Sequence, residues 1–174
     1  MADVGIILGS DSDLPEISQC FTILEKFNIQ FEIAVSSAHR TPEETKQWVS
    51  TAPSRGIKVI IAAAGGAAHL PGVVASHTIL PVVGVPMSTT ISGGLDSLLS
   101  IVQMPSGIPV GTMATGKAGG ANAALYAVSI IALTDAGLSA KLADYRKEMA
   151  ETVKGKNAKL QQLGWKAYID GMKK

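Results

Sequence analysis

Five short runs of apolar, often β-branched residues alternate with segments of helix length along this chain of 174 residues. The runs are VGIIL (4–8), FEIAV (31–35), KVIIAAA (58–64), PVVGV (81–85) and a weaker VGTMA (110–114). Continuous apolar runs of this length are typical of parallel strands that are buried on both faces. Parallel neighbours need crossover helices, and right-handed crossovers put helices on both faces of the sheet. The alternation therefore predicts an α/β fold with a doubly wound parallel sheet.

The segments between the runs complete a flavodoxin-like, three-layer αβα sandwich with a five-stranded sheet. Helices are expected over residues 14–27, 41–55, 69–78, 94–103 and 117–136. Asp13 followed by Pro15 predicts one helix start, and Thr41-Pro42-Glu43-Glu44 predicts a capping box with proline at the first helical position. Residues 117–136 offer almost no polar face, which predicts burial on all sides, between the sheet and a partner subunit.

A helical extension follows the sheet. After Gly137, apolar residues recur at helical spacing, namely Leu138, Leu142, Tyr145, Met149 and Val153. A second, short helix is expected near residues 160–169, after Gly155. We expect an α/β catalytic domain over residues 1–155 and a C-terminal helical tail of the same domain over residues 156–174.

Charge is scarce and unevenly distributed. Charged residues make up 17% of the chain, against about 25% in an average soluble protein, so we expect copies of the chain to cover part of its surface. The net charge of +1 gives no reason to expect nucleic acid or membrane as a partner. Residues 138–174 carry 9 Lys and Arg against 4 Asp and Glu, which favours a solvated helical tail.

Cys20 is the only cysteine, and this favours a reducing compartment. The N-terminus has no signal-peptide pattern, and the apolar stretch 123–133 is shorter than the roughly 20 residues that span a bilayer. These features predict a soluble, cytoplasmic protein.

In an open parallel sheet, ligands bind outside the carboxyl ends of the strands. The loops after the five strands are GSDSD (9–13), SSAHRTP (36–42), AGGAAHLPG (64–72), PMSTTISGG (86–94) and ATGKAGG (114–120). Their small residues let backbone N–H groups approach a ligand, and the helix starts that follow favour phosphate. Glycine is also ordinary in turns, so the prediction of a phosphate site depends on several such loops meeting at one edge.

Polar residues in these loops are candidates for ligand contacts. Ser10 and Ser12 carry hydroxyls suited to phosphate, while Asp11 and Asp13 can accept hydrogen bonds from ribose hydroxyls; capping alone would also explain Asp13. Arg40 and Lys117 are the only basic residues in these loops, and the arginine fork suits a phosphate dianion.

The three histidines differ in position. His39 precedes a helix start among small residues, where an imidazole can move a proton at neutral pH. His69 lies in the third loop, at the start of the predicted helix, and either contacts ligand or braces the neighbouring loop. His77 is expected to be structural.

Several other chemistries lack their motifs. GSDSD is neither a Walker A loop nor a GxGxxG fingerprint, which argues against ATP and NAD. No GxSxG elbow is present, and the histidines lack the clustered ligands of a metal site. The loops contain no aromatic residue of the kind that stacks on a flavin, which argues against FMN. Trp48 and Trp165 lie in predicted helices and are expected to pack in the core or at an interface.

Taken together, the motifs resemble one family. GSDSD, SAHRTP, AGGAAHLPG, SLLSIVQMPSGIPVGT and GKAGGANAAL, in this order, resemble N5-carboxyaminoimidazole ribonucleotide mutase, the class I phosphoribosylaminoimidazole carboxylase catalytic subunit family. The resemblance covers about residues 4 to 150. It implies an enzyme of de novo purine biosynthesis, an isomerase that moves a carboxyl group from the exocyclic nitrogen of an aminoimidazole ribonucleotide to ring carbon C4. It also implies a homo-octamer that uses no metal, ATP or biotin.

The resemblance also implies roles for individual residues. Ser10, Ser12, Ser37 and Arg40 fall where the family holds phosphate, and Asp13 where it holds ribose hydroxyls. Gly65, Gly66 and Ala67 would line the pocket of the migrating carboxylate, with backbone N–H groups of the Gly65–Gly66 loop stabilising it. His39 matches the catalytic histidine.

Two alternatives remain at this point. The class II relatives add CO2 directly to aminoimidazole ribonucleotide and share the fold and a histidine in the second loop, although Arg40 and the run GGAAHLPG resemble class I. The second alternative is a non-catalytic nucleotide-monophosphate binding module, in which His39 is only a contact. The loop PMSTTISGG departs from the family pattern in its two threonines and paired glycines, so its substrate contacts are not predicted.

Overall fold

A parallel five-stranded sheet forms the centre of the computed structural model, which describes residues 1–172. Its strands are β1 (Val4–Leu8), β2 (Phe31–Val35), β3 (Val59–Ala64), β4 (Val82–Pro86) and β5 (Gly111–Thr112), in the order β2-β1-β3-β4-β5. Val4 is aligned with Phe31 on one side and with Val59 on the other. The predicted flavodoxin-like order is confirmed, although the weak fifth run forms only two residues of strand.

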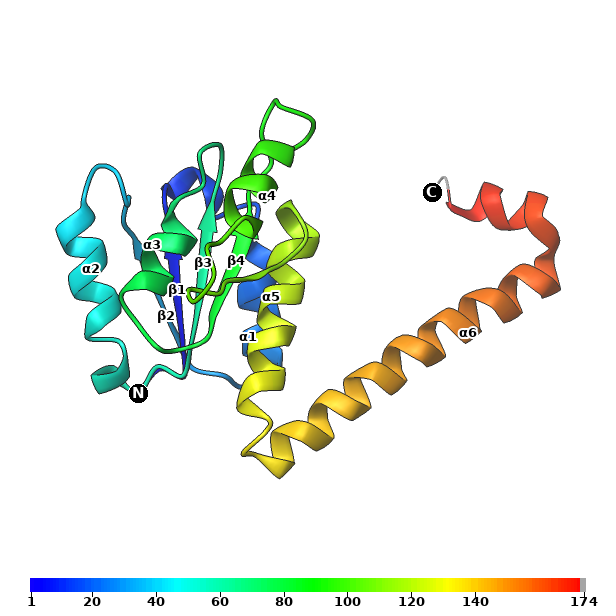
Figure 1. Cartoon of the computed structure of the whole chain (residues 1–174). Helices are drawn as coiled ribbons and strands as arrows, with labels where there is room; N and C mark the ends of the chain where they lie inside the picture. Colours follow the sequence, from blue (N-terminus) through cyan, green and yellow to red (C-terminus); the bar gives the residue numbers. More distant parts are fainter. Residues whose placement is uncertain (173–174) are drawn as a thin grey trace.

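Helices cover both faces of the sheet (Figure 1). α1 (Ser18–Lys26) and α5 (Gly116–Ile131) lie on one face, and α2 (Pro42–Ser50), α3 (Leu70–Ser76) and α4 (Leu95–Val102) lie on the other. Because successive strand residues point to opposite faces, Ile6 joins the core under α1 and α5, whereas Ile7 joins the core under α2 and α3. Both are fully buried, and burying such a side chain contributes about 1.5–3 kcal/mol.

Two helix starts differ in detail from the predictions. The helix expected from residue 14 begins at Ser18 and has no side-chain cap, so Asp13 does not cap it. It is preceded by a 3-10 helix, η1 (Asp11–Asp13), which the Ser10 side chain caps. Pro42 does occupy the first helical position of α2. The capping box at Thr41 does not form, because Thr41 Oγ1 donates to the Ser37 carbonyl at 3.2 Å and accepts from the Ser37 N–H at 3.0 Å. This bond ties the second loop to the helix that follows it.

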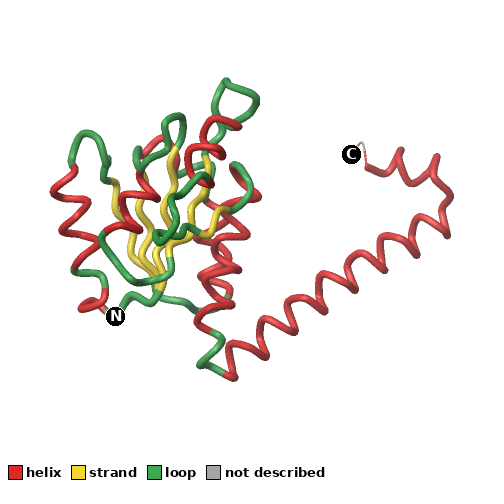
Figure 2. The backbone as a smooth tube through the Cα atoms, viewed as in Figure 1, coloured by secondary structure: helices red, strands yellow, loops and turns green. Residues whose placement is uncertain are grey.

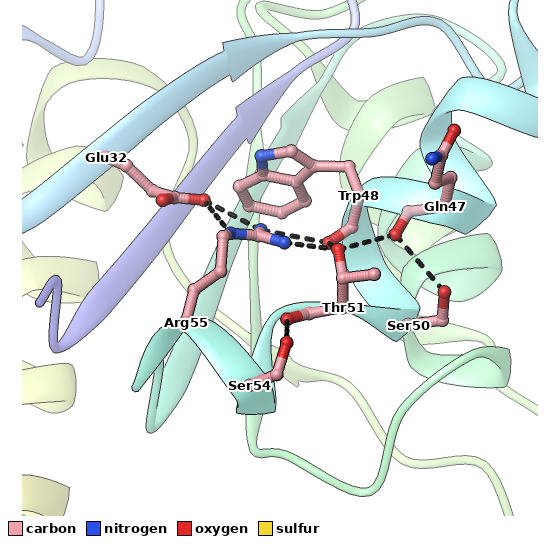
Figure 3. Close-up of polar contacts among 7 residues, drawn as sticks. All are labelled: Glu32, Gln47, Trp48, Ser50, Thr51, Ser54 and Arg55. Carbon is pink, nitrogen blue, oxygen red and sulfur yellow. Dashed lines mark hydrogen bonds and ion pairs between the residues drawn. The ribbon is translucent and has the colours of Figure 1, made fainter.

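Trp48 and Arg55 fix α2 against the edge of the sheet (Figure 3). A Cβ on Gly5 would lie 2.8 Å from Trp48 Cη2, so the indole packs on β1 where only glycine leaves room. Arg55, in the 3-10 helix η2 (Pro53–Arg55), donates through Nη2 to Glu32 Oε1 at 2.7 Å and to the Trp48 carbonyl at 3.0 Å. The predicted packing role of Trp48 is confirmed, and the Arg55–Glu32 pair joins the segment after α2 to β2.

The long helix α6 (Ala136–Met172) leaves the body of the molecule as an arm (Figure 1). Its start is anchored: Leu138 is buried, and the Tyr145 ring meets the Phe27 ring edge-on at 5.6 Å. The break expected at Gly155 is wrong, because the helix continues through it and is interrupted only at Gly164, at φ 72° and ψ 156°. A glycine costs an exposed helix only about 1 kcal/mol. The division at residues 155 and 156 stays a prediction.

Apolar side chains remain uncovered in the single chain. α5 buries one side against the sheet and α1, and Tyr126 on this helix is 46% exposed, so the predicted burial of its other side against a partner subunit stays a prediction. Trp165 on α6 is 64% exposed and therefore does not belong to a core within this chain. No helix among residues 1–172 is long and apolar enough to cross a membrane.

Candidate active site

The loops that follow the strands meet at one edge of the sheet, where the strands end (Figure 2). A cavity of about 360 Å³ opens there between the first three of these loops. Eight predicted site residues line it, namely Ser10, Asp13, Ser37, His39, Arg40, Gly65, Ala67 and His69. Three of the five loops therefore contribute to one cavity at this edge.

The first loop presents hydroxyl groups at the end of β1. Ser12 donates through its hydroxyl to Ser10 Oγ at 2.8 Å and through its N–H to the same oxygen at 3.3 Å. The Gly9 N–H donates to the Ala63 carbonyl at 3.2 Å, which holds the loop beside β3. Ser10 Oγ is thus fixed at the cavity wall.

Among residues 1–172, Asp13 is the one side chain with a carboxylate that lines this cavity. Burial raises the pKa of this carboxyl above its ordinary value, and the negative charge of Glu16 adds to that effect, while the Ser12 hydroxyl opposes it. A half-buried carboxylate that lacks strong donors is well suited to accept hydrogen bonds from hydroxyl groups of a ligand.

The second loop is braced by hydroxyl groups. Ser37 Oγ accepts the N–H of His39 at 3.4 Å and the N–H of Arg40 at 3.3 Å. The hydroxyl oxygen of buried Ser36 lies 2.7 Å from Thr45 Oγ1 of α2, and the two hydroxyl groups share a hydrogen bond. This arrangement fixes the backbone under His39 and Arg40, and their side chains remain at the surface of the cavity.

Arg40 and His39 reach different neighbours. Arg40 Nη2 donates to the Gly9 carbonyl at 3.3 Å, which places its guanidinium over the first loop, near Ser10. His39 Nε2 lies 2.8 Å from Nδ1 of His69, and the two rings meet edge-on with centroids 4.9 Å apart. The positive fork and the imidazole pair therefore occupy separate parts of one cavity.

The third loop turns sharply after β3. Gly66 has a positive φ of 67°, which glycine adopts without strain, and its N–H donates to Oγ of buried Ser97 at 2.9 Å. That N–H is therefore engaged within the chain, and the stabilisation of a carboxylate by the Gly65–Gly66 loop stays a prediction.

Some predicted residues lie beside the cavity. Asp11, Ser12 and Gly66 do not line it, and neither do the fourth and fifth loops, which include Lys117. The cavity is completed by Gly9, Ala38, Ala64 and Leu70, which lie in the predicted ligand-facing loops but were not named as site residues. They carry no polar side chain, so nothing in the sequence singled them out within those loops.

A larger cavity of about 530 Å³ lies where β4 and β5 begin. Of the residues around it, only Tyr126 has a titratable side chain, so it offers no acid, base or phosphate fork. The single cysteine is no nucleophile, since burial raises the pKa of Cys20 to about 12. Among residues 1–172, no cluster of three or more His, Cys, Asp or Glu is arranged to hold a metal ion.

Comparison with known proteins gives consistent matches. The family model described as AIR carboxylase matches residues 3–152. The N5-carboxyaminoimidazole ribonucleotide mutase of Pyrococcus horikoshii is 52% identical over 166 residues, which are 95% of this chain and 93% of that protein. The protein of the same name from Thermotoga maritima is 51% identical over 98% of both chains.

Solved structures agree with this result. The crystal structure of Treponema denticola PurE superposes with a TM-score of 0.82 and 27% sequence identity, and the match covers 90% of this chain and 97% of that one. The predicted α/β fold is thereby confirmed.

Proposed function

The chain belongs to the AIR carboxylase family, and on that premise we propose that it converts N5-carboxyaminoimidazole ribonucleotide to 4-carboxy-5-aminoimidazole ribonucleotide. The enzyme is a mutase of purine biosynthesis. The observation that carries this proposal is the placement of His39, hydrogen-bonded to His69, in the same cavity as Arg40 and Ser10.

The phosphate of the substrate is held by Arg40, Ser10 and Ser37. Ser12 fixes Ser10 through the hydrogen bond between their hydroxyl groups. The Arg40 side chain lies over the first loop through its bond to Gly9, and a guanidinium fork binds a phosphate dianion through two parallel hydrogen bonds. Asp13 accepts hydrogen bonds from the ribose hydroxyls. Asp11 lies next to this subsite and not in the cavity, so its contribution is to the local negative charge.

The carboxyl group moves within the pocket of the third loop. The bond between the exocyclic nitrogen and the carboxyl carbon breaks, the electron pair stays on nitrogen, and nitrogen takes a proton. C4 then attacks the released CO2, and the C4 proton leaves to a base. Holding CO2 against C4 between Gly65 and Ala67 makes this second step effectively unimolecular.

His39 relays the proton between the exocyclic nitrogen and C4. Its hydrogen bond to His69 couples the tautomers of the two rings, because one of the two facing nitrogens must donate and the other accept. His69 therefore holds the orientation of His39 and takes part in setting which ring nitrogen carries the proton. Reaction at this site is proposed to need no metal, ATP or biotin.

We further propose a homo-octamer in the cytoplasm. The small charged fraction of 17% and the exposed Met149, Val153 and Trp165 on α6 support assembly through that arm. Sedimentation of the purified chain tests this, since a species of 18.0 kDa alone would rule out the assembly.

The decisive assay compares two substrates without ATP. The purified protein is given N5-carboxyaminoimidazole ribonucleotide, or aminoimidazole ribonucleotide with bicarbonate, and the C4-carboxylated product is measured. We expect efficient turnover of the first substrate. Preference for the second would identify a direct carboxylase, and binding without turnover would identify a nucleotide-binding module.

A further inference from the structure

Glu16 joins the first and fourth loops across the edge of the sheet. Its carboxylate accepts the N–H of Ser88 at 3.2 Å through Oε1 and at 3.3 Å through Oε2, and it also accepts the Ser88 hydroxyl in a short hydrogen bond. The two residues are 72 positions apart in the sequence. One side chain therefore binds both the backbone and the hydroxyl of the loop whose role the motifs left open.

The fifth loop packs against the same carboxylate. Gly116, at the start of α5, has a φ of 69° and is buried. A Cβ on Gly116 would lie 2.5 Å from Glu16 Oε1 and 3.0 Å from Ser88 Oγ. Glycine is required there for its conformation and for space, so three of the five loops meet at Glu16.

This junction reaches the cavity through the residues on either side of Ser88. A Cβ on Gly65, which lines the cavity, would lie 3.2 Å from Cβ of Met87 and 3.7 Å from Cγ2 of Thr89. Met87 is buried, and its N–H donates to the Ala64 carbonyl at 2.9 Å. The segment that Glu16 holds is thus the wall behind the third loop.

Glu16 also adjoins the opposite wall. Its backbone N–H donates to the Asp13 carbonyl at 3.1 Å, and its charge acts on the Asp13 carboxyl, which lines the cavity. A displacement of Glu16 would therefore shift residues on both sides of the cavity in which the released CO2 is held.

We propose that Glu16 is a positioning residue that holds the fourth loop against Gly65 and so retains CO2 between release from nitrogen and attack by C4. This inference rests on the proposed mutase function. If the wall loosens, CO2 escapes and free aminoimidazole ribonucleotide leaves the enzyme. The distinguishing signature is the division of substrate between the two products, since a general loss of folded protein would not change it.

The test uses the full chain, four variants of the Glu16–Ser88 pair and one control variant. Glu16→Ala and Ser88→Ala each remove one partner, the double variant removes both, and Glu16→Gln keeps an oxygen that can accept the Ser88 N–H. Glu25→Gln, an exposed glutamate at the far end of α1, is the matched control for charge. Each protein is given N5-carboxyaminoimidazole ribonucleotide, and both the 4-carboxy product and free aminoimidazole ribonucleotide are measured, less the enzyme-free background.

For Glu16→Ala we expect kcat to fall by about 10- to 100-fold, the range for a misplaced reacting group, with KM nearly unchanged and free aminoimidazole ribonucleotide as a main product. Ser88→Ala should act in the same way, the double variant should be no worse than Glu16→Ala, and Glu16→Gln should restore most of the wild-type ratio. An unchanged product ratio in Glu16→Ala, with or without a loss of rate, would overturn the proposal. Failure of the wild type to convert the substrate would instead overturn the proposed function, and this inference with it.

Discussion

Replacing Arg40 by alanine tests the phosphate assignment directly. Arg40 is exposed, and within residues 1–172 its side chain donates one hydrogen bond, to the Gly9 carbonyl at 3.3 Å. A single exposed bond of this length contributes no more than about 0.5–1.5 kcal/mol to folding. The variant should therefore fold normally, and its defect should appear in ligand binding.

The size of that defect follows from the chemistry of the fork. A hydrogen bond to a charged group is worth about 1.5–3 kcal/mol, and each 1.4 kcal/mol changes a dissociation constant tenfold. Loss of Arg40 should thus raise the dissociation constant of the ribonucleotide product by about 10- to 100-fold. Arg40→Lys keeps the charge but not the guanidinium fork, so its dissociation constant should lie between those of Arg40→Ala and the wild type.

Isothermal titration with 4-carboxy-5-aminoimidazole ribonucleotide provides the measurement, and the corresponding nucleoside provides a ligand without phosphate. Lys46→Ala, an exposed cation on α2, is the matched control for the loss of one positive charge. Nucleoside binding should be equal in wild type and Arg40→Ala. If nucleotide binding were also equal, or if Lys46→Ala were as damaging, Arg40 would not be the phosphate ligand.

Two further substitutions address the proton and the ribose. His39→Asn should lower kcat by at least about 100-fold, the usual contribution of a general acid or base, and leave the product dissociation constant nearly unchanged; near-normal turnover would remove His39 from proton transfer. Asp13→Asn should weaken nucleotide binding and flatten the pH dependence of stability. Burial raises the pKa of Asp13 above 3.8 in the folded chain, so the folded state holds that proton to higher pH than the unfolded state. The free energy of unfolding of the wild type then falls as pH rises from 3.8 through the raised value, and stays lower above it. Urea titrations across this pH interval should show a smaller fall in the free energy of unfolding for Asp13→Asn than for the wild type. Parallel plots of that free energy against pH for the two proteins would contradict this account.

Local patterns were sufficient for the architecture of this chain. Runs such as 4–8 and 81–85 are apolar on both faces, which restricts them to a covered parallel sheet, and the loops that follow them must then share one edge. The positions of Ser10, His39 and Arg40 at that edge follow from the same argument, because each lies in a loop that follows a strand. Boundaries were less predictable, as α6 shows, because a single exposed glycine is a weak interruption of a long helix.

Pairs that are distant in sequence depended on the tertiary structure. His39 and His69 are 30 positions apart, and their hydrogen bond exists because β1 separates β2 from β3 by a fixed spacing at the edge of the sheet. The same holds for Ser97 with Gly66 and for Glu16 with Ser88. The sequence alone determined which residues reach the carboxyl edge, because strand and loop patterns are local. Only the packed structure decided which of them touch, because a hydrogen bond requires its donor and acceptor to lie about 3 Å apart, and no local pattern carries that precision.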